Sequence, residues 1–162
     1  MMKWAAMDPS RDEEPSLTLK LVKGTIVALD LDRFDEMVKE KGWNRYSPNT
    51  ITGLLSNLVY DLSRKWSGTV VFGLDWRRGT EEAIIEIPCV EPIELKDYLM
   101  RIWKEINNAG AKITIVAIKD YVIGKNARSR REAYYGTHGR SRAIRLLRKL
   151  KRAGGNKVYI EN

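Results

Sequence analysis

The feature that most constrains this chain is an apolar run, Val27–Asp32, that ends in the alternating acids Asp30 and Asp32. The residues from Thr25 to Leu31 are nearly all apolar, which predicts a central strand that is buried on both faces. A buried strand has little reason to end in carboxylates, because an uncompensated buried charge is costly. A second acidic pair, Glu81–Glu82, follows a Gly-Thr turn and opens another apolar run. Two such pairs are a common way to hold a hard cation such as Mg²⁺, and solvated strand ends are the simpler alternative.

The composition limits the classes of protein to which this chain can belong. The chain has 162 residues, of which 43% are hydrophobic and 31% charged, enough for one domain with its own core. No apolar run approaches the ~20 residues that span a bilayer, and the first residues lack the apolar core of a signal peptide. Cys89 is the only cysteine and His138 the only histidine, so neither a disulfide nor an ordinary zinc site can form within the chain. These features predict a cytoplasmic protein without a membrane partner, and the charge-rich composition is typical of a thermophile.

The net charge of +8 is concentrated near the C-terminus. Residues 125–157 hold twelve Lys and Arg against one acid, Glu132, so this segment carries +11 and the rest of the chain about −3. Arginines interleaved with tyrosines suit RNA or DNA, because phosphates pair with the cations and unpaired bases stack on the rings. The candidate nucleic-acid contacts are Arg128, Arg130, Arg131, Tyr134, Tyr135, Arg140 and Arg142. Two other interpretations remain open: a solvated basic face, or a loop that closes over a bound triphosphate.

Hydrophobic periodicity and turn residues predict the order of the elements. We expect residues 1–16 to form a flexible tail and residues 17–162 to form a single domain. We expect strands over 17–21, 25–31, 68–76, 82–87, 112–118 and 157–160, and helices over 33–43, 47–66, 92–108 and 141–153, with no clear period over 125–140. This order predicts a ferredoxin-like α+β palm: an antiparallel-rich sheet with helices on one face, in the order βααββαβ, plus a C-terminal helix and strand. The first strand then lies beside the hairpin, so Asp30, Asp32, Glu81 and Glu82 gather at neighbouring edges.

Three segments of the chain resemble the GGDEF diguanylate cyclases. Asp30–Phe34, with Gly42 twelve residues beyond Asp30, is similar to the family's Asp-Ile-Asp-x-Phe and its following Gly. Arg77–Ala83, which continues apolar to Pro88, is similar to a degenerate Arg-Tyr-Gly-Gly-(Asp/Glu)-Glu-Phe signature. Leu150–Val158 resembles the family's Ala-Lys-x-x-Gly-Arg-Asn before the last strand. The resemblance covers about residues 25–160 and implies the palm that class III nucleotidyl cyclases and polymerase-like CRISPR subunits also contain.

The resemblance implies a nucleotide site with Mg²⁺ or Mn²⁺ as cofactor. Its catalytic residues would be Asp30, Glu81 and Glu82, and its metal ligands these three carboxylates and the carbonyl of Leu31. Its phosphate contacts would be the backbone N–H groups of Arg33 and Phe34, at a helix N-terminus, and the side chains of Lys151 and Arg152.

The departures from the family fall on the base-reading half of that site. Val38 and Ser47 stand where the family reads guanine. Thr80 replaces the second Gly of the signature, and Gly155 replaces an arginine that contacts phosphate. The capacity to bind a metal is therefore better preserved than the specificity for a base.

Two functions follow as expectations. The first is a Mg²⁺-dependent palm domain that binds a nucleoside triphosphate and performs nucleotidyl transfer, either by cyclising one nucleotide or by condensing two across a homodimer. The alternative is a catalytically inactive palm that serves as a nucleic-acid-binding or assembly module. Nucleotide binding that requires Mg²⁺ and Asp30 favours the first, and steeply salt-dependent RNA or DNA binding that is indifferent to Asp30 favours the second.

Overall fold

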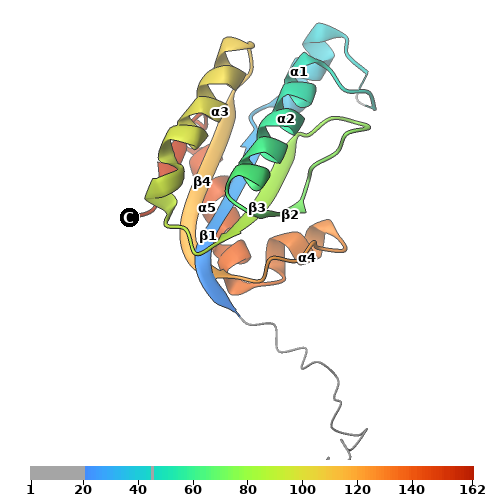
Figure 1. The fold of residues 1–162 in the computed structure, drawn as a ribbon. Coiled ribbons are helices and arrows are strands. Elements are labelled where there is room, and N and C mark those ends of the chain that lie inside the picture. The colour runs from blue at the N-terminus through green and yellow to red at the C-terminus, as the bar shows by residue number, and fades with distance from the viewer. Residues whose placement is uncertain (1–20, 45) are drawn as a thin grey trace, which may run out of the picture.

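The computed structural model describes residues 21–44 and 46–162, which form one five-stranded sheet between two layers of helices (Figure 1). The strands lie in the order β2-β3-β1-β4-β5. Their bounds are β1 Val22–Leu31, β2 Thr69–Phe72, β3 Glu82–Pro88, β4 Ile113–Val122 and β5 Val158–Ile160. Every neighbouring pair is antiparallel except β4 with β5. The predicted α+β class with a mostly antiparallel sheet is confirmed.

Strand β1 occupies the centre of the sheet, as its apolar sequence predicts. It pairs with β3 on one side and with β4 on the other. Residues Ile26 to Leu29 are at most 1% exposed. Successive side chains of a strand point to opposite faces, so Val27 and Leu29 join one core while Ile26 and Ala28 join another. The strand is therefore buried from both sides.

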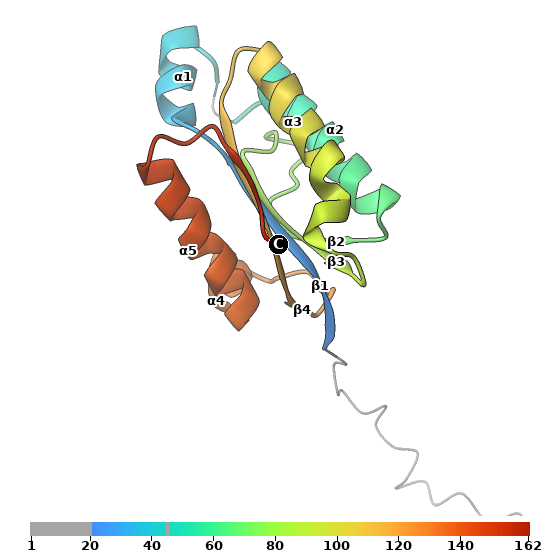
Figure 2. The same cartoon turned by 90° about the vertical axis from the view of Figure 1, so that its left-hand side faces the viewer.

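The helices cover both faces of the sheet, which corrects the prediction that they share one face (Figure 2). They are α1 Phe34–Lys41, α2 Thr50–Lys65, the 3₁₀ turn η1 Pro92–Leu95, α3 Lys96–Asn108, α4 Arg130–Tyr135 and α5 His138–Arg152. Helices α2 and α3 pack against the first core, and α4 and α5 against the second. A central strand that is apolar on both faces needs such a cover on each side, because exposed apolar surface is unfavourable.

Helix α4 lies in the segment for which the sequence shows no period, and this is a second correction. The hydroxyl of Ser129 caps it by accepting from the backbone N–H of Glu132. The hydroxyl of Thr137 caps α5 in the same way, so α5 begins at His138 and not at residue 141. A helix of six residues completes fewer than two turns, too few for periodicity to reveal it.

The remaining boundaries differ by a few residues. Strand β4 continues to Val122 because residues 119–122 pair with the start of β1. Strand β2 stops at Phe72 and not at residue 76, since Gly73 turns the chain with φ 106°, and a Cβ there would lie 2.0 Å from the carbonyl oxygen of Glu82. The predicted tail over 1–16, and the strand over 17–21 except for its last residue, lie outside the described residues; Leu21 itself is in no strand. None of the described helices is long and apolar enough to cross a membrane.

Candidate functional site

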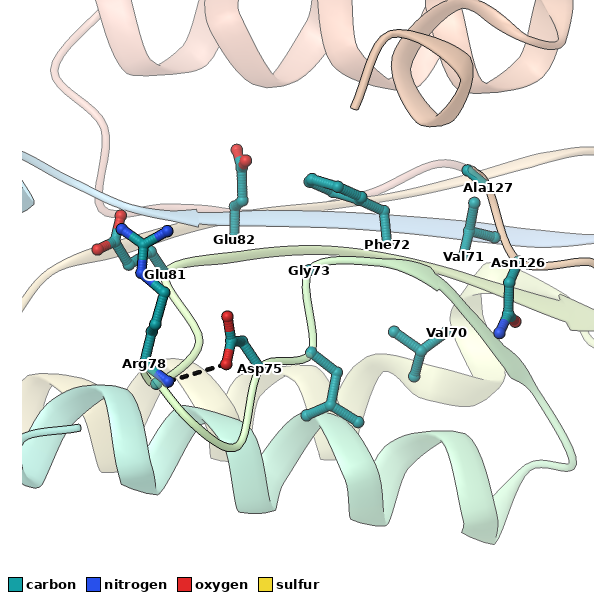
Figure 3. A pocket seen from close by; sticks show the side chains of 12 residues that line it. Val70, Val71, Phe72, Gly73, Asp75, Arg78, Glu81, Glu82, Asn126 and Ala127 are labelled. Carbon is teal, nitrogen blue, oxygen red and sulfur yellow. Dashed lines mark hydrogen bonds between the residues drawn. The ribbon is translucent and has the colours of Figure 1, made fainter. Parts of the chain in front are cut away.

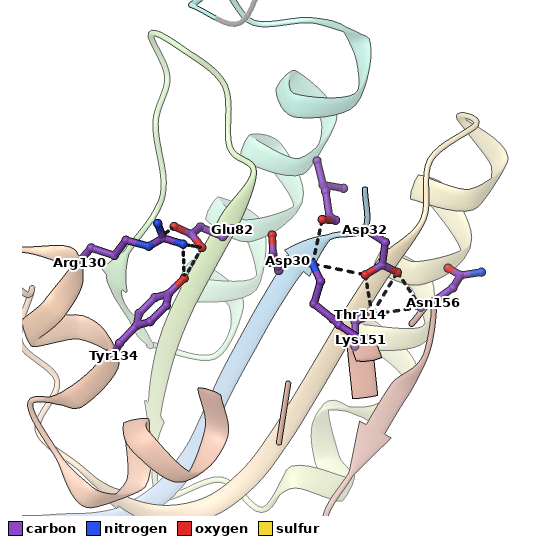
Figure 4. Close-up of polar contacts among 9 residues, drawn as sticks. Asp30, Asp32, Glu82, Thr114, Arg130, Tyr134, Lys151 and Asn156 are labelled. Atoms are coloured by element: carbon purple, nitrogen blue, oxygen red, sulfur yellow. Dashed lines mark hydrogen bonds and ion pairs between the residues drawn. The ribbon is translucent and has the colours of Figure 1, made fainter. Parts of the chain in front are cut away.

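The register of β1 and β3 places Asp30 directly opposite Glu82. Both side chains lie on the sheet face that α4 and α5 cover, since Asp30 alternates with Ile26 and Ala28 on that face. The pairing continues one residue further, where the backbone N–H of Leu31 donates to the carbonyl of Glu81 at 3.0 Å. The structure thus brings the two acidic segments together at one end of the sheet (Figure 4).

Lys151 of α5 reaches the end of β1 and places its ammonium among three oxygens (Figure 4). Its Nζ donates to Asp30 Oδ2 at 2.7 Å and to the carbonyl of Leu31 at 3.0 Å, and it lies 3.5 Å from Asp32 Oδ1. Burial raises the pKa of the Asp30 carboxyl from 3.8 to about 6, although the hydrogen bond and charge of Lys151 act in the opposite direction. Asp30 Oδ2 and the carbonyl oxygen of Leu31, which the resemblance assigns to a metal, therefore both contact the Lys151 ammonium.

Asp32 anchors the turn before β5. Its Oδ1 accepts from the Thr114 hydroxyl at 2.8 Å, and its Oδ2 accepts from the backbone N–H of Asn156 at 2.7 Å. A Cβ on Gly155 would lie 2.7 Å from Asp32 Oδ2, so this close approach requires glycine. The contact with Asp32 thereby explains Gly155 and Asn156 in the turn after α5.

Glu82 is held by α4, the helix that the sequence did not reveal. Arg130 Nη2 donates to Glu82 Oε2 at 3.1 Å, and Arg130 Nε lies 3.1 Å from Oε1. The Tyr134 hydroxyl also donates to Oε2, and the guanidinium of Arg130 lies 5.0 Å from the centre of the Tyr134 ring. Burial, followed by the hydrogen bond to Glu82, raises the pKa of the Tyr134 phenol. Arg130, predicted as a nucleic-acid contact, thus lies at the acidic site.

A cavity of about 460 Å³ opens at this place, at the start of α1. Arg33, with φ 50°, turns the chain from β1 into α1, and both Arg33 and Phe34 line the cavity. The lining also includes five carboxylates and two further cations: Asp30, Asp35, Glu36, Glu81, Glu82, Arg130 and Lys151. Arg152, the other predicted phosphate contact, is exposed and does not line the cavity.

A second cavity, of about 550 Å³, adjoins the first and shares Glu81 and Glu82 with it (Figure 3). It follows β2 and the loop after it. Val70, Phe72 and Leu74 supply apolar surface, and Asp75, Arg78 and Asn126 supply polar groups. Its mixed lining differs from the ionic lining of the first cavity.

Within residues 21–44 and 46–162, no three His, Cys, Asp or Glu side chains are grouped so that they could hold a metal ion. Asp30 is engaged by Lys151, and Glu82 by Arg130 and Tyr134. Mg²⁺ frequently binds through only one or two carboxylates together with substrate phosphates and water.

Two of the predicted nucleic-acid contacts, Arg140 and Tyr134, are buried, and a third, Arg142, is partly exposed and held in ion pairs. Arg140 is 3% exposed, and its Nη2 donates to Glu86, which is fully buried, at 2.8 Å. The Tyr134 ring is buried under α5, and Arg142 pairs with Asp120 and Glu161. Arg140 and Tyr134 are buried because the segment folds back on the sheet as α4 and α5, so neither side chain lies on the surface as predicted. Arg128, Arg131 and Tyr135 remain exposed.

The residues that only the structure adds to the site are Asp35, Glu36 and Arg130. Asp35 and Glu36 lie in the first turn of α1, directly after the Asp-x-Asp segment, and their position in the sequence could have suggested them. No protein-family model and no curated protein matches this chain.

Proposed function

We propose that the protein binds a nucleoside triphosphate together with Mg²⁺ at the cavity between β1, β3 and α1, and that it catalyses nucleotidyl transfer. The observation that carries this proposal is that the Asp30 carboxylate and the Leu31 carbonyl both accept from the Lys151 ammonium, at 2.7 and 3.0 Å. Asp30 also lies directly opposite Glu82. Hard oxygen donors grouped in this way suit a divalent cation better than they suit a neutral ligand.

The charge of the cavity supports a requirement for metal. Its five carboxylates outnumber its three cations, so the lining carries a formal charge of −2. A bare triphosphate would be repelled by that field, whereas a triphosphate with bound Mg²⁺ carries less negative charge. The residues that would hold the ion are Asp30, Leu31 through its carbonyl, and Glu81 or Glu82. When bound, Mg²⁺ would supply Lewis-acid polarisation of the reacting phosphate.

The chain itself offers three groups for the phosphates. Lys151 would leave Asp30 and pair with phosphate oxygens, since its ammonium lies at the cavity wall. Arg130 also lines the cavity, on the side of Glu82, with which it forms an ion pair. The backbone N–H groups of Arg33 and Phe34 precede the first hydrogen-bonded turn of α1 and suit anions. Fixed donors around the transferring phosphate stabilise the charge that develops there.

The adjoining cavity supplies room for the nucleoside. Ligand sites commonly combine apolar walls with a few polar groups, as Val70, Phe72 and Asn126 do in this cavity. Cyclisation needs one nucleotide in one chain, whereas condensation needs a second nucleotide from a second chain. The products therefore distinguish the two reactions.

The test is titration of the protein with each nucleoside triphosphate, with and without Mg²⁺, followed by mass analysis of the products. We expect binding that requires Mg²⁺ and that Asp30→Ala abolishes. Asp97→Ala, which removes an exposed carboxylate of α3, is the matched control and should bind as the unaltered protein does. Binding that is equally strong in EDTA, or that survives in Asp30→Ala, would refute the proposal.

A further inference from the structure

A row of cations follows the outward face of α5. Arg145, Arg148, Lys149 and Arg152 are all exposed, and their spacing of three and four residues places them on one side of the helix. The opposite side of α5 is buried against the sheet through Ala143, Ile144 and Leu147. These four residues, called the α5 stripe below, extend over about 10 Å of the helix axis.

The α5 stripe has no acidic partners within the part of the chain that the structure describes. The ion pairs of α4 and α5 involve other residues, namely Arg130, Arg140, Arg142 and Lys151. Within the stripe, Arg145 with Lys149 and Arg148 with Arg152 are like charges four residues apart, an arrangement that destabilises a helix. A surface that concentrates unpaired like charge in this way is complementary to a polyanion.

An exposed aromatic ring lies beside the stripe. Tyr135, the last residue of α4, is 52% exposed. Arg148 Nη1 donates to its hydroxyl at 2.9 Å, and the guanidinium of Arg148 lies 6.0 Å from the ring centre. Phosphate groups and lipid head groups need no such ring, whereas an unpaired base stacks on one.

We propose that the α5 stripe and Tyr135 bind single-stranded nucleic acid, with the cations on the backbone phosphates and one base on the tyrosine ring. None of these five residues lines either cavity. The proposal is therefore independent of the proposed nucleotide site, and Asp30→Ala should leave this binding unchanged.

The first experiment is fluorescence anisotropy with a labelled single-stranded 20-mer over a series of salt concentrations. Arg145→Ala/Lys149→Ala removes two stripe charges, and Lys96→Ala/Lys104→Ala removes two exposed charges from α3 on the other side of the sheet. We expect the stripe variant to bind about tenfold or more weakly and to lower the salt slope by about 1.4, from ~0.7 per lost phosphate contact. The α3 variant should bind as the unaltered protein does. Equal losses in both variants, or none in the stripe variant, would overturn the proposal.

The second experiment separates nucleic acid from other polyanions. Tyr135→Leu should weaken oligonucleotide binding about fivefold or more, the loss expected for one stacked base, and should leave heparin binding unchanged. Equal weakening for heparin, no weakening for the oligonucleotide, or equally tight binding of phosphatidylserine vesicles would each overturn the assignment to single-stranded nucleic acid.

Discussion

Replacement of Asp30 by asparagine should stabilise the free protein at neutral pH. The side chain is largely buried, and burial raises its pKa from 3.8 to about 6 in spite of the ion pair with Lys151. The folded state therefore favours the neutral form of Asp30, and asparagine is neutral at every pH. A residue that lowers stability at the candidate site is expected where function requires a charge.

The magnitude follows from the two pKa values. The difference between a pKa of 3.8 and one of about 6 corresponds to about 3 kcal/mol at pH values well above 6. The Asp30 side chain is 31% exposed, so solvent screening reduces this figure, and we expect a gain of about 1–2 kcal/mol. For a chain of this size, that gain raises Tm by about 2–8 °C.

The sign of the pH dependence is fixed by the same shift. An acid whose pKa is raised on folding destabilises the protein above its folded pKa. This cost declines as the pH falls from 6 towards 4 and is absent below the unfolded value. The gain from Asp30→Asn should consequently be present at pH 7.5 and nearly absent at pH 4.

Urea unfolding at pH 7.5 and pH 4 measures both quantities, with Asp97→Asn on exposed α3 as the control. An Asp30→Asn protein that is less stable than the unaltered one at pH 7.5 would refute the reasoning. That result would mean that the attraction of Lys151 for Asp30 exceeds the cost of burying the carboxylate. A gain of equal size at both pH values would also contradict it.

Three further predictions concern other contacts. Arg140→Met should lower the free energy of unfolding by about 3–5 kcal/mol in urea titrations, because it leaves the buried Glu86 unpaired. The double variant with Glu86→Leu should recover most of that loss, and a double variant whose loss equals the sum of the two single losses would contradict the pairing. Asn49→Ala should cost about 1 kcal/mol by the same measurement, since it removes the cap that accepts the first N–H groups of α2, and no loss would show that the cap is dispensable. Lys151→Met should weaken Mg²⁺–nucleotide binding about tenfold or more in calorimetry, whereas unchanged affinity would remove Lys151 from the phosphate site.

Local patterns in the sequence sufficed for the strands, most helices and the place of the first acidic pair. The apolar run of β1 predicts a strand buried on both faces, and residues 26–29 are buried in that way. The Gly-Thr turn predicts the hairpin of β2 with β3, whereas Glu82 lies opposite Asp30 through the pairing of β3 with β1. These features are local because periodicity reports which side of an element is buried, and turn residues report where the chain reverses.

Only the tertiary structure determines which Lys or Arg pairs with which carboxylate. Lys151 and Asp30 are separated by 121 positions, and Arg140 and Glu86 by 54. In the sequence, Arg140 and Arg145 are alike, yet one is buried against a carboxylate and the other is exposed. The difference arises from the packing of α4 and α5 on the second face of the sheet, which neither periodicity nor composition encodes. Ion pairs between distant segments depend on register and packing, and these exist only once the elements have assembled.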